Sequence, residues 1–424
     1  MTEPQLAAEG ARAAIAAIVG AEHIRPALPA DSLDGLQPVA VVAPADAAQV
    51  AAVLHCCADR GLAVAPRGGG SKLALGNCPA RLDFVLSTER LNRVVEHAAA
   101  DLTVTVEAGC TIARLQAALA AGGQRLACDP LLPERATVGG VVATAESGTL
   151  RIRYGAIRDL VLGLDLALPD GNLVRAGGKV VKNVAGYDLT RLAIGSLGTL
   201  GVITRVTFRL HPVAVARASW SAVLPSAEAA GQLLLAIRQS HVVFTGLQVR
   251  ATRPGYLTVD VCCEGIPESL SEYRVRLAQA TGGAAFADSA PEVWEARSAL
   301  YAESGDALVL KASVQPGQVG DLCAIVFRCV GTAGAAASVV AQASGLAEVR
   351  IEGSDAAQRA LLSPLEAEIE KLGGSLVVAR APLALKRELD VWGRAGASLE
   401  VMRRIKQKFD PAGVLNPGRF LGGI

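Results

Sequence analysis

Residues 62–72, LAVAPRGGGSK, place a short apolar run directly before three consecutive glycines. The run from Leu62 to Ala65 predicts a buried strand. The loop after it consists of Pro66, Arg67, Gly68, Gly69, Gly70, Ser71 and Lys72. Because glycine has no Cβ atom, successive backbone N–H groups in such a loop can approach phosphate oxygens and form an anion-binding nest. The stretch therefore predicts a strand of an α/β arrangement that ends in a phosphate-binding loop.

The spacing of this loop fits neither common nucleotide-binding template. Gly68 and Gly70 are not followed by a third glycine at Leu73, as GxGxxG requires, and no GxxxxGK[ST] passes through Lys72 or Lys179. A nicotinamide Rossmann site and a P-loop ATPase are therefore disfavoured. Taken alone, the triple glycine fits a plain loop equally well.

The chain around this loop alternates between strands and helices. Residues 39–43 predict a short strand, and Asp46 with Gln49 three positions later predicts the capped start of a helix. Residues 102–107 alternate as a strand does and lead into a helix behind Thr111.

Further glycine-rich motifs continue towards Leu210, where a strand ends. They are ATVGGVVA (136–143), SG (147–148), the hairpin turn PDGN (169–172), GGKVVKNVAGYDL (177–189) and GSLGTLG (195–201). Near the C-terminus, a helix predicted over 399–408 leads into FDPAGVLNPGRF (409–420).

From about residue 215 the glycine-rich loops thin out. Strands are predicted over 247–250, 257–263, 307–314, 337–342 and 376–379. Helices are predicted over 267–279, 317–329 and 355–371. This order predicts an antiparallel sheet with helices on one face, so the whole chain is assigned to the α+β class.

Composition limits the partners. The 424 residues include 41 Lys and Arg and 40 Asp and Glu, so no charge excess favours nucleic acid or an acidic membrane surface. No apolar run predicts a direct membrane span, and the first residues lack a signal-peptide pattern, which predicts a cytoplasmic protein. The nine cysteines show no CxxC, iron–sulfur or zinc spacing and are interpreted as small buried side chains.

In combination the motifs are more specific than the glycine loop alone. PxGGG, ATVGG, a hairpin DG, KNVAGYDL, GSLGTLG and FDPxGxLNPG occur in the order typical of the vanillyl-alcohol-oxidase/PCMH flavoproteins. The chain resembles this family over about residues 36–214 and the C-terminal tail. In detail, KNVAGYD (182–188), DVWG (390–393) and LNPGRF (415–420) resemble the FAD-binding E-subunit family of bacterial glycolate oxidases.

The resemblance implies a domain organisation. A helical extension (1–35) precedes a PCMH-type FAD-binding domain of two α/β subdomains (36–214). An α+β cap domain with an antiparallel sheet (215–398) follows. The C-terminal helix and tail (399–424) then return to the flavin.

The resemblance also implies the residues that hold FAD. The amides from Arg67 to Ser71, after Pro66, bind the pyrophosphate. The isoalloxazine and ribityl side is lined by Thr137, Val138, Gly139, Gly140, Ser147 and Gly148. The adenine half is covered by Gly198, Gly201 and Ile203, and the tail contributes Asn416 and Arg419. Asn416 could equally be a turn residue before Pro417, and Lys182 and Tyr187 fit a surface lysine and a packed ring as well as site residues.

Relatives that attach FAD covalently carry a histidine in or just after the first glycine loop, where this chain has Ser71 and Lys72. The resemblance therefore implies non-covalent FAD.

Catalytic residues stay unknown. The related catalytic subunits carry HxGDGNxH and EHG motifs, whereas the five histidines of this chain, at 23, 55, 97, 211 and 241, stand apart, and residues 389–394 read LDVWGR. We therefore expect no metal and an FAD-bearing subunit that supports electron transfer during oxidation of glycolate, a 2-hydroxy acid, to glyoxylate. Its expected partners are a catalytic flavoprotein subunit and an iron–sulfur subunit, which could hold it at the inner face of the membrane.

Two alternatives remain open at this level. One is a self-sufficient FAD-dependent 2-hydroxy-acid dehydrogenase, with Arg380, Lys386 and Arg394 as candidate carboxylate anchors. The other is a structural subunit with a vestigial flavin site.

Overall fold

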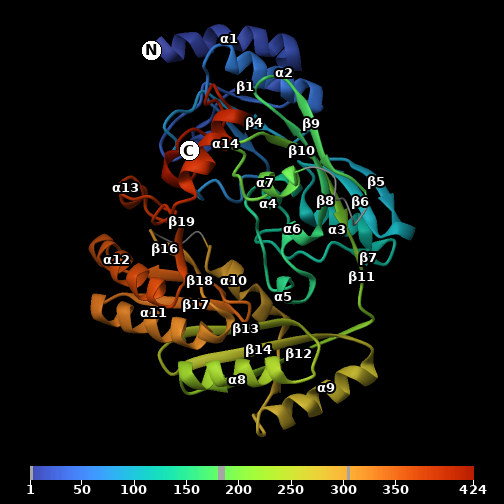
Figure 1. Cartoon of the computed structure of the whole chain (residues 1–424), viewed down its shortest axis with the longest axis vertical. Coiled ribbons are helices and arrows are strands. Elements are labelled where there is room, and N and C mark those ends of the chain that lie inside the picture. Colours follow the sequence, from blue (N-terminus) through green and yellow to red (C-terminus); the bar gives the residue numbers. More distant parts are fainter. Residues whose placement is uncertain (1–2, 180–186, 303–305) are drawn as a thin grey trace. The chain divides into compact units, whose positions relative to one another are not determined.

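The computed structural model describes residues 3–179, 187–302 and 306–424, with side chains described from residue 9 onward. The chain divides into two compact units, whose elements can be followed in Figure 1. Unit 1 comprises Met1–Gly148, Gly155–Val213 and Arg394–Ile424, and unit 2 comprises Thr149–Tyr154 and Ala214–Gly393. The C-terminal tail therefore belongs to the same unit as the glycine loop. Within the described residues, no helix has the length and apolar character needed to cross a membrane.

The first sheet of unit 1 carries the glycine loop. Its strand order is β1 (Ile24–Pro26), β2 (Ala40–Val42), β4 (Phe84–Ser87) and β3 (Val64–Arg67). Strands β2 and β3 pair with β4 in parallel, and α2 (Ala47–Ala58) follows β2 with Asp46 as its cap, as predicted. The parallel pairing brings the ends of β3 and β4 to one edge of the sheet.

The N-terminal helix α1 (Glu3–Val19) is part of the core of unit 1. Its buried residues Ile15 and Val19 belong to the same apolar cluster as Leu54 of α2 and Phe84 of β4. At about 25 cal/mol per Å² of buried apolar surface, each such side chain adds about 1.5–3 kcal/mol to folding. The segment before residue 36 is therefore integral to this sheet.

The second sheet of unit 1 is antiparallel, with the order β5 (Val94–Ala98), β6 (Thr103–Glu107), β10 (Val202–Arg209), β8 (Val161–Ala167) and β9 (Leu173–Gly177). The predicted hairpin turn at 169–172 joins β8 to β9, with Gly171 at φ +84°. Strand β6 is confirmed and all of its residues are buried, with the polar side chains satisfied where Thr105 bonds to Thr207 and Glu107 pairs with Arg93.

Short elements complete unit 1. They are α3 (Ile112–Ala120), capped by Thr111 as predicted, β7 (Gln124–Arg125), α4 (Val138–Ala143), α6 (Ile157–Leu160), α7 (Leu189–Ala193), β11 (His211–Pro212) and α14 (Leu399–Phe409).

Unit 2 is built on one eight-stranded antiparallel sheet. Its order is β15 (Ala287–Asp288), β12 (Ala216–Leu224), β14 (Tyr256–Gly265), β13 (Phe244–Arg253), β17 (Ala336–Gln342), β18 (Leu346–Glu352), β16 (Leu308–Ser313) and β19 (Ser375–Arg380). Its helices are α5 (Arg151–Tyr154), α8 (Ala227–Gln239), α9 (Pro267–Ala280), α10 (Ala296–Ala299), α11 (Val319–Ala333), α12 (Asp355–Lys371) and α13 (Leu383–Lys386). The predicted α+β cap with an antiparallel sheet is confirmed, whereas α8, β12 and β18 had not been predicted.

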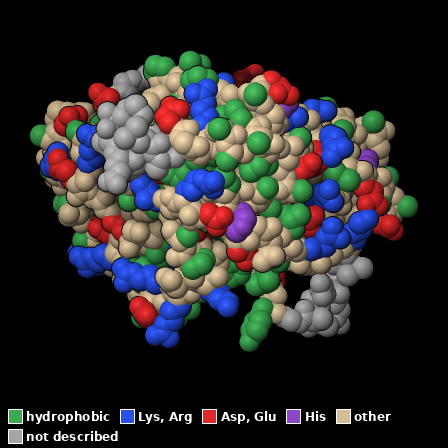
Figure 2. Space-filling view, turned by 90° about the horizontal axis from the view of Figure 1, so that it is seen from above, with side chains coloured by type: hydrophobic (Ala, Val, Ile, Leu, Met, Phe, Trp, Pro, Cys, Tyr) green, Lys and Arg blue, Asp and Glu red, His purple; other side chains and the backbone are tan. Residues whose placement is uncertain are grey.

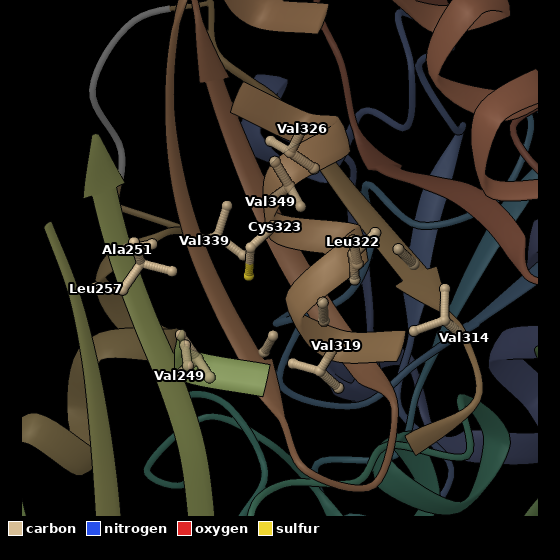
Figure 3. Close-up of a cluster of buried hydrophobic side chains, with 14 of the residues drawn as sticks. Val249, Ala251, Leu257, Val314, Val319, Leu322, Cys323, Val326, Val339 and Val349 are labelled. Carbon is tan, nitrogen blue, oxygen red and sulfur yellow. The ribbon is translucent and has the colours of Figure 1, made fainter. Parts of the chain in front are cut away.

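Alternation along the strands separates the two faces of this sheet. Val249, Val339 and Val349 point towards Leu322 and Cys323 of α11, as Figure 3 shows. This face is the apolar core of unit 2. The cysteine interpretation is also confirmed, because every cysteine except Cys78 is buried, and burial raises the pKa of the Cys323 thiol to about 12.

The surface carries no extended field of one charge sign on the face seen in Figure 2, where basic and acidic side chains are interspersed. This agrees with the balanced composition of the chain.

Candidate functional site

The two glycine-rich regions that the sequence separates lie against each other in unit 1. A Cβ atom added to Gly69 would lie 1.8 Å from the carbonyl oxygen of Arg135, and one added to Gly68 would lie 2.0 Å from Oγ1 of Thr137. Distances this short exclude any side chain at either position. These two glycines are therefore required by the close approach of the second loop, in addition to any approach of a phosphate.

Two adjoining clefts lie along this contact. The first is lined by Pro66, Arg67, Gly68, Thr88, Ala108, Gly139, Gly140, Ala143, Leu197, Gly198, Gly201, Val202 and Ile203. The second is lined by residues 66–73, Leu75, Thr137, Gly140, Ala143, Thr144, Leu197, Asn416 and Arg419. The shared residues show that the clefts adjoin at the first turn of the glycine loop. The region thus brings together the β3 loop, the start of α4, the 195–201 loop and the C-terminal tail.

Most of the predicted site residues line these clefts, but three do not. Val138, the first residue of α4, is fully buried in the apolar core. Ser147 and Gly148 lie outside both linings, and a Cβ atom on Gly148 would meet Asp129 at 2.3 Å. Direct contact of these three residues with a flavin stays a prediction that these linings do not support.

Other lining residues were missed by sequence reasoning. Thr88 follows β4, so the parallel pairing of β3 and β4 brings it to the same sheet edge as the glycine loop. Leu197 holds a left-handed conformation, at φ +52°, and its backbone N–H donates to the Ala143 carbonyl at 2.8 Å. A polar residue directly after a strand next to the loop was the available signal for Thr88. For Leu197 the signal was its place inside the glycine-rich motif at 195–201.

Gly140 forms an open part of the cleft floor. It lines both clefts, and an added Cβ atom would meet only Oγ1 of Thr137, at 3.2 Å. The Thr137 hydroxyl also caps α4 by accepting from the Gly140 N–H. Gly140 thus differs from Gly68 and Gly69, because a side chain here would extend into the cleft instead of into the protein.

Asn416 carries a buried hydrogen-bond acceptor that has no partner in the described protein. Its Nδ2 donates to the Leu197 carbonyl at 2.7 Å, and its backbone N–H donates to Val64 at 3.0 Å. Its Oδ1 is buried without a hydrogen bond among the described residues. Leaving such an acceptor unsatisfied costs about 1–3 kcal/mol, so this position suits a ligand that donates a hydrogen bond, such as a ribityl hydroxyl. The residues present therefore fit a flavin nucleotide.

Arg419 secures the segment after the glycine loop. It is 4% exposed and donates from Nη2 to the carbonyls of Leu73 and Leu75, at 2.7 and 2.6 Å. Burial lowers the pKa of its guanidinium to about 10. Arg419 lines the second cleft, but these bonds direct part of its guanidinium towards the protein backbone.

Lys406 ties the 195–201 loop to the C-terminal tail. Its ammonium donates to the carbonyls of Thr199 and Leu415, at 2.8 and 2.9 Å, and to Oδ2 of Asp410 at 2.6 Å. Burial lowers the pKa of Lys406. Asp410 in turn accepts from the backbone N–H groups at 414 and 415. The FDPAGVLNPGRF motif therefore ends α14 and holds Asn416 in place.

Charged side chains at the glycine loop are paired with carboxylates. Lys72, at the end of the glycine loop, lies 3.0 Å from Oε2 of the buried Glu146. Arg67 donates from Nη1 to Oδ1 of Asp31 at 2.6 Å. Hydrogen bonds, chiefly from Arg25 and then from Arg67, hold the pKa of the Asp31 carboxyl well below its usual range.

The five histidines lie away from both cleft linings. His97 bonds to Gln124 at 2.9 Å and His55 lies beside Asp59 at 3.7 Å, so both are accounted for by local contacts. Within the described residues, no group of His, Cys, Asp and Glu has the arrangement of a metal site. Tyr187 is 96% exposed, and Lys182 lies outside the described residues.

The second face of the unit 2 sheet is polar and nevertheless buried. Asp260 is fully buried and accepts from Arg250 at 2.6 Å. Arg350, 6% exposed, donates to the carbonyl of Leu300 at 3.0 Å. Of the candidate carboxylate anchors, Lys386 is buried, and Arg380 donates to the Tyr301 carbonyl at 3.3 Å.

Comparison with known proteins agrees with this geometry. Residues 38–177 match the family described as FAD binding domain, and residues 386–420 match the C-terminal domain of FAD linked oxidases. Glycolate oxidase subunit GlcD of Bacillus subtilis is 33% identical over 55% of this chain. That alignment spans 49% of the relative, about half its length.

Two further similarities extend over nearly the whole chain. The mitochondrial D-lactate dehydrogenase (cytochrome) of Arabidopsis thaliana is 26% identical over 91% of this chain and 73% of its own. The structure of p-cresol methylhydroxylase with substrate bound superposes with a TM-score of 0.79, at 16% identity over 99% of this chain and 97% of that chain. The chain therefore carries an FAD binding domain over residues 38–177 and a match to the C-terminal domain of FAD linked oxidases over residues 386–420, its cofactor is FAD, and its fold is similar to that of p-cresol methylhydroxylase.

Proposed function

We propose that this chain is the FAD-binding subunit of a complex that oxidises a 2-hydroxy acid, with glycolate as the first candidate substrate. The substrate class is supported by the relatives, which are named a glycolate oxidase subunit and a D-lactate dehydrogenase. Glycolate and D-lactate share a hydroxyl group on the carbon next to a carboxylate. Oxidation removes a hydride from that carbon and a proton from its hydroxyl, leaving a 2-oxo acid.

The roles of the chain's own residues follow from the clefts. Backbone N–H groups of Gly68, Gly69, Gly70 and Ser71 bind the diphosphate, and Asn416 accepts a hydrogen bond from the flavin nucleotide. Bound FAD supplies the two-electron acceptor for the hydride. Gly198, Gly201 and Ile203 line the adenine side.

One observation carries the assignment to a non-catalytic subunit. The titratable side chains in the two described linings are Arg67, Lys72 and Arg419, all of them cationic. Lys72 is ion-paired with the buried Glu146, which keeps its ammonium occupied. None of these groups is suited to take the hydroxyl proton of the substrate, because a general base must be able to accept a proton near neutral pH.

The general base and the onward transfer of electrons are then supplied by partner subunits. We propose a catalytic flavoprotein subunit and an iron–sulfur subunit, and a cytoplasmic complex held at the inner face of the membrane through those partners. This chain contributes the FAD and supports electron transfer.

The test uses the purified full chain. Its visible spectrum should show bound FAD, which anaerobic glycolate, D-lactate or D-2-hydroxyglutarate leaves oxidised over minutes. With a dye acceptor, activity should appear only after the catalytic and iron–sulfur partners are added. Rapid bleaching by the chain alone would overturn the subunit assignment, and a colourless preparation that takes up no added FAD would favour a vestigial site.

A second candidate is a self-sufficient 2-hydroxy-acid dehydrogenase. The similarity to the D-lactate dehydrogenase over 91% of the chain favours it. In that case a cationic side chain such as Arg380 would bind the substrate carboxylate. Turnover by the isolated chain, lost in Arg380→Gln with FAD still bound, would decide for this candidate.

A further inference from the structure

The N-terminal segment before residue 36 has no role in the function proposed above, yet it supplies a carboxylate to the glycine loop. We infer that Asp31 is a positioning residue of the FAD site, which holds the guanidinium of Arg67 in place to bind the FAD diphosphate. The inference rests on the assignment of the clefts to FAD.

Asp31 accepts as many hydrogen bonds as a carboxylate readily takes. Its Oδ1 accepts from Arg67 Nη1 at 2.6 Å and from Arg25 Nη2 at 2.9 Å. Its Oδ2 accepts from Arg25 Nη1 at 2.7 Å and from the Leu28 backbone N–H at 2.8 Å. The residue is 5% exposed. Because each oxygen has two partners, the carboxylate has a single well-defined orientation.

The Arg67 end of this network lies at the clefts. Arg67 is the last residue of β3, its side chain is 14% exposed, and it lines both clefts. A guanidinium carries several N–H donors in a fixed planar fork. Among the described residues, the Arg67 guanidinium donates one hydrogen bond, to Oδ1 of Asp31. Its other donors are available to an anion, and a planar fork suits the oxygens of a diphosphate.

Holding an arginine before the ligand arrives has a clear advantage. A free arginine side chain samples many rotamers, and that freedom is lost when it binds a phosphate. Asp31 removes the freedom in advance. Arg25 balances the charge of Asp31, so the network keeps a net positive charge beside the loop.

Positioning and simple charge attraction predict opposite results for Asp31→Asn. This change removes a negative charge near the diphosphate, so charge attraction alone would tighten FAD binding. Loss of positioning would weaken it instead. We expect the dissociation constant of FAD, measured by quenching of flavin fluorescence, to rise about 10-fold in Asp31→Asn.

Glu107→Gln is the matched control. Glu107 is also a buried carboxylate that accepts from an arginine, Arg93, but neither residue lines a cleft. The variant should lose some thermal stability and keep the FAD affinity of the wild type. An equal loss of affinity in Glu107→Gln and Asp31→Asn would show that the Asp31 effect is one of general stability, and would overturn the inference.

A double-mutant cycle separates positioning from structure even if the single variants are less stable. Once Arg67→Gln has removed the fork, Asp31→Asn should change the FAD dissociation constant by less than about 2-fold. Additive losses, or unchanged or tighter FAD binding in Asp31→Asn, would contradict the inference. If the wild-type chain binds no FAD at all, the cleft assignment itself fails, which is a distinguishable result.

Discussion

The side-chain amide of Asn416 donates a hydrogen bond to the main-chain carbonyl of Leu197, a residue 219 positions earlier, at 2.7 Å. Both residues have left-handed backbone conformations, with φ of +44° and +52°. The bond fixes the Asn416 amide so that Oδ1 is the atom left without a protein partner. The C-terminal tail thus presents one defined acceptor at the cleft.

Asn416→Gly should weaken FAD binding while the fold persists. Glycine adopts φ +44° without strain, so the variant loses the side chain but keeps the backbone. The dissociation constant of FAD should rise about 10-fold, since a hydrogen bond contributes about 1 kcal/mol or more. Asn416→Ala adds left-handed strain of about 1–2 kcal/mol and should also unfold at lower temperature. FAD titration and thermal unfolding distinguish the two effects.

The half-buried Asn92 offers a control for these variants. Its side-chain amide donates to the Glu89 carbonyl at 2.8 Å and the residue lines neither cleft, so Asn92→Gly should leave FAD affinity unchanged. Wild-type affinity in Asn416→Gly would remove Asn416 from the site.

Gly140→Leu should fill the cleft at the cost of a small shift of the Thr137 hydroxyl. Its Cβ atom would lie 3.2 Å from Oγ1 of Thr137, and the rest of the side chain would occupy the space where the linings adjoin. We expect more than about 100-fold weaker FAD binding, with apo-protein unfolding within about 1 kcal/mol of the wild type. Gly331→Leu, at an exposed position of α11 with no atom within 4 Å of an added Cβ, is the control.

Gly69→Val should behave differently from Gly140→Leu. Valine at position 69 would block the approach of the diphosphate to the loop amides. The structure adds a clash with Arg135, so this variant should lose both FAD and stability. Full flavin retention in Gly69→Val would show that the glycine loop is not the diphosphate site.

Acid precipitation should release all of the flavin into the supernatant. Ser71 and Lys72 replace the histidine of covalent relatives, and the Lys72 ammonium is paired with Glu146 at 3.0 Å. Flavin absorbance of the supernatant, compared with total flavin before precipitation, checks this. Fluorescence that stays with the protein band in a denaturing gel would contradict it.

Asp31 should make stability depend on acid pH. Its pKa is lowered in the folded chain, chiefly by the hydrogen bonds from Arg25, so the folded state favours the charged carboxylate. That contribution is fully present above the unfolded pKa, about 3.9, and is lost as pH falls through the folded value. Wild type should exceed Asp31→Asn by about 2 kcal/mol at pH 6. Urea unfolding should show the difference shrinking below about pH 4, and a difference independent of pH would contradict the assignment.

Much of the fold follows from local pattern. Some sequence signals depend only on the backbone conformation of the residues that carry them. Examples are the three glycines after an apolar run, the cap at Asp46 and the hairpin at 169–172. The alternating strands over 247–250 and 257–263 were found for the same reason. Strand β12 (Ala216–Leu224) was missed, because its ARASWSAVL sequence mixes alanine and serine and gives a weak hydrophobic signal.

The sequence by itself determined the glycine loop, the FAD-type order of motifs and the return of the LNPG tail. Only the tertiary structure decided that Gly69 lies against the Arg135 carbonyl while Gly140 faces the cleft. It also decided that the Asn416 amide donates to the Leu197 carbonyl and that Asp31 accepts a hydrogen bond from Arg67. A sequence pattern describes the conformation and burial of neighbouring residues. Contacts between residues 36 or 219 positions apart depend instead on the path of the whole chain, which brings the two glycine regions and the tail to one sheet edge.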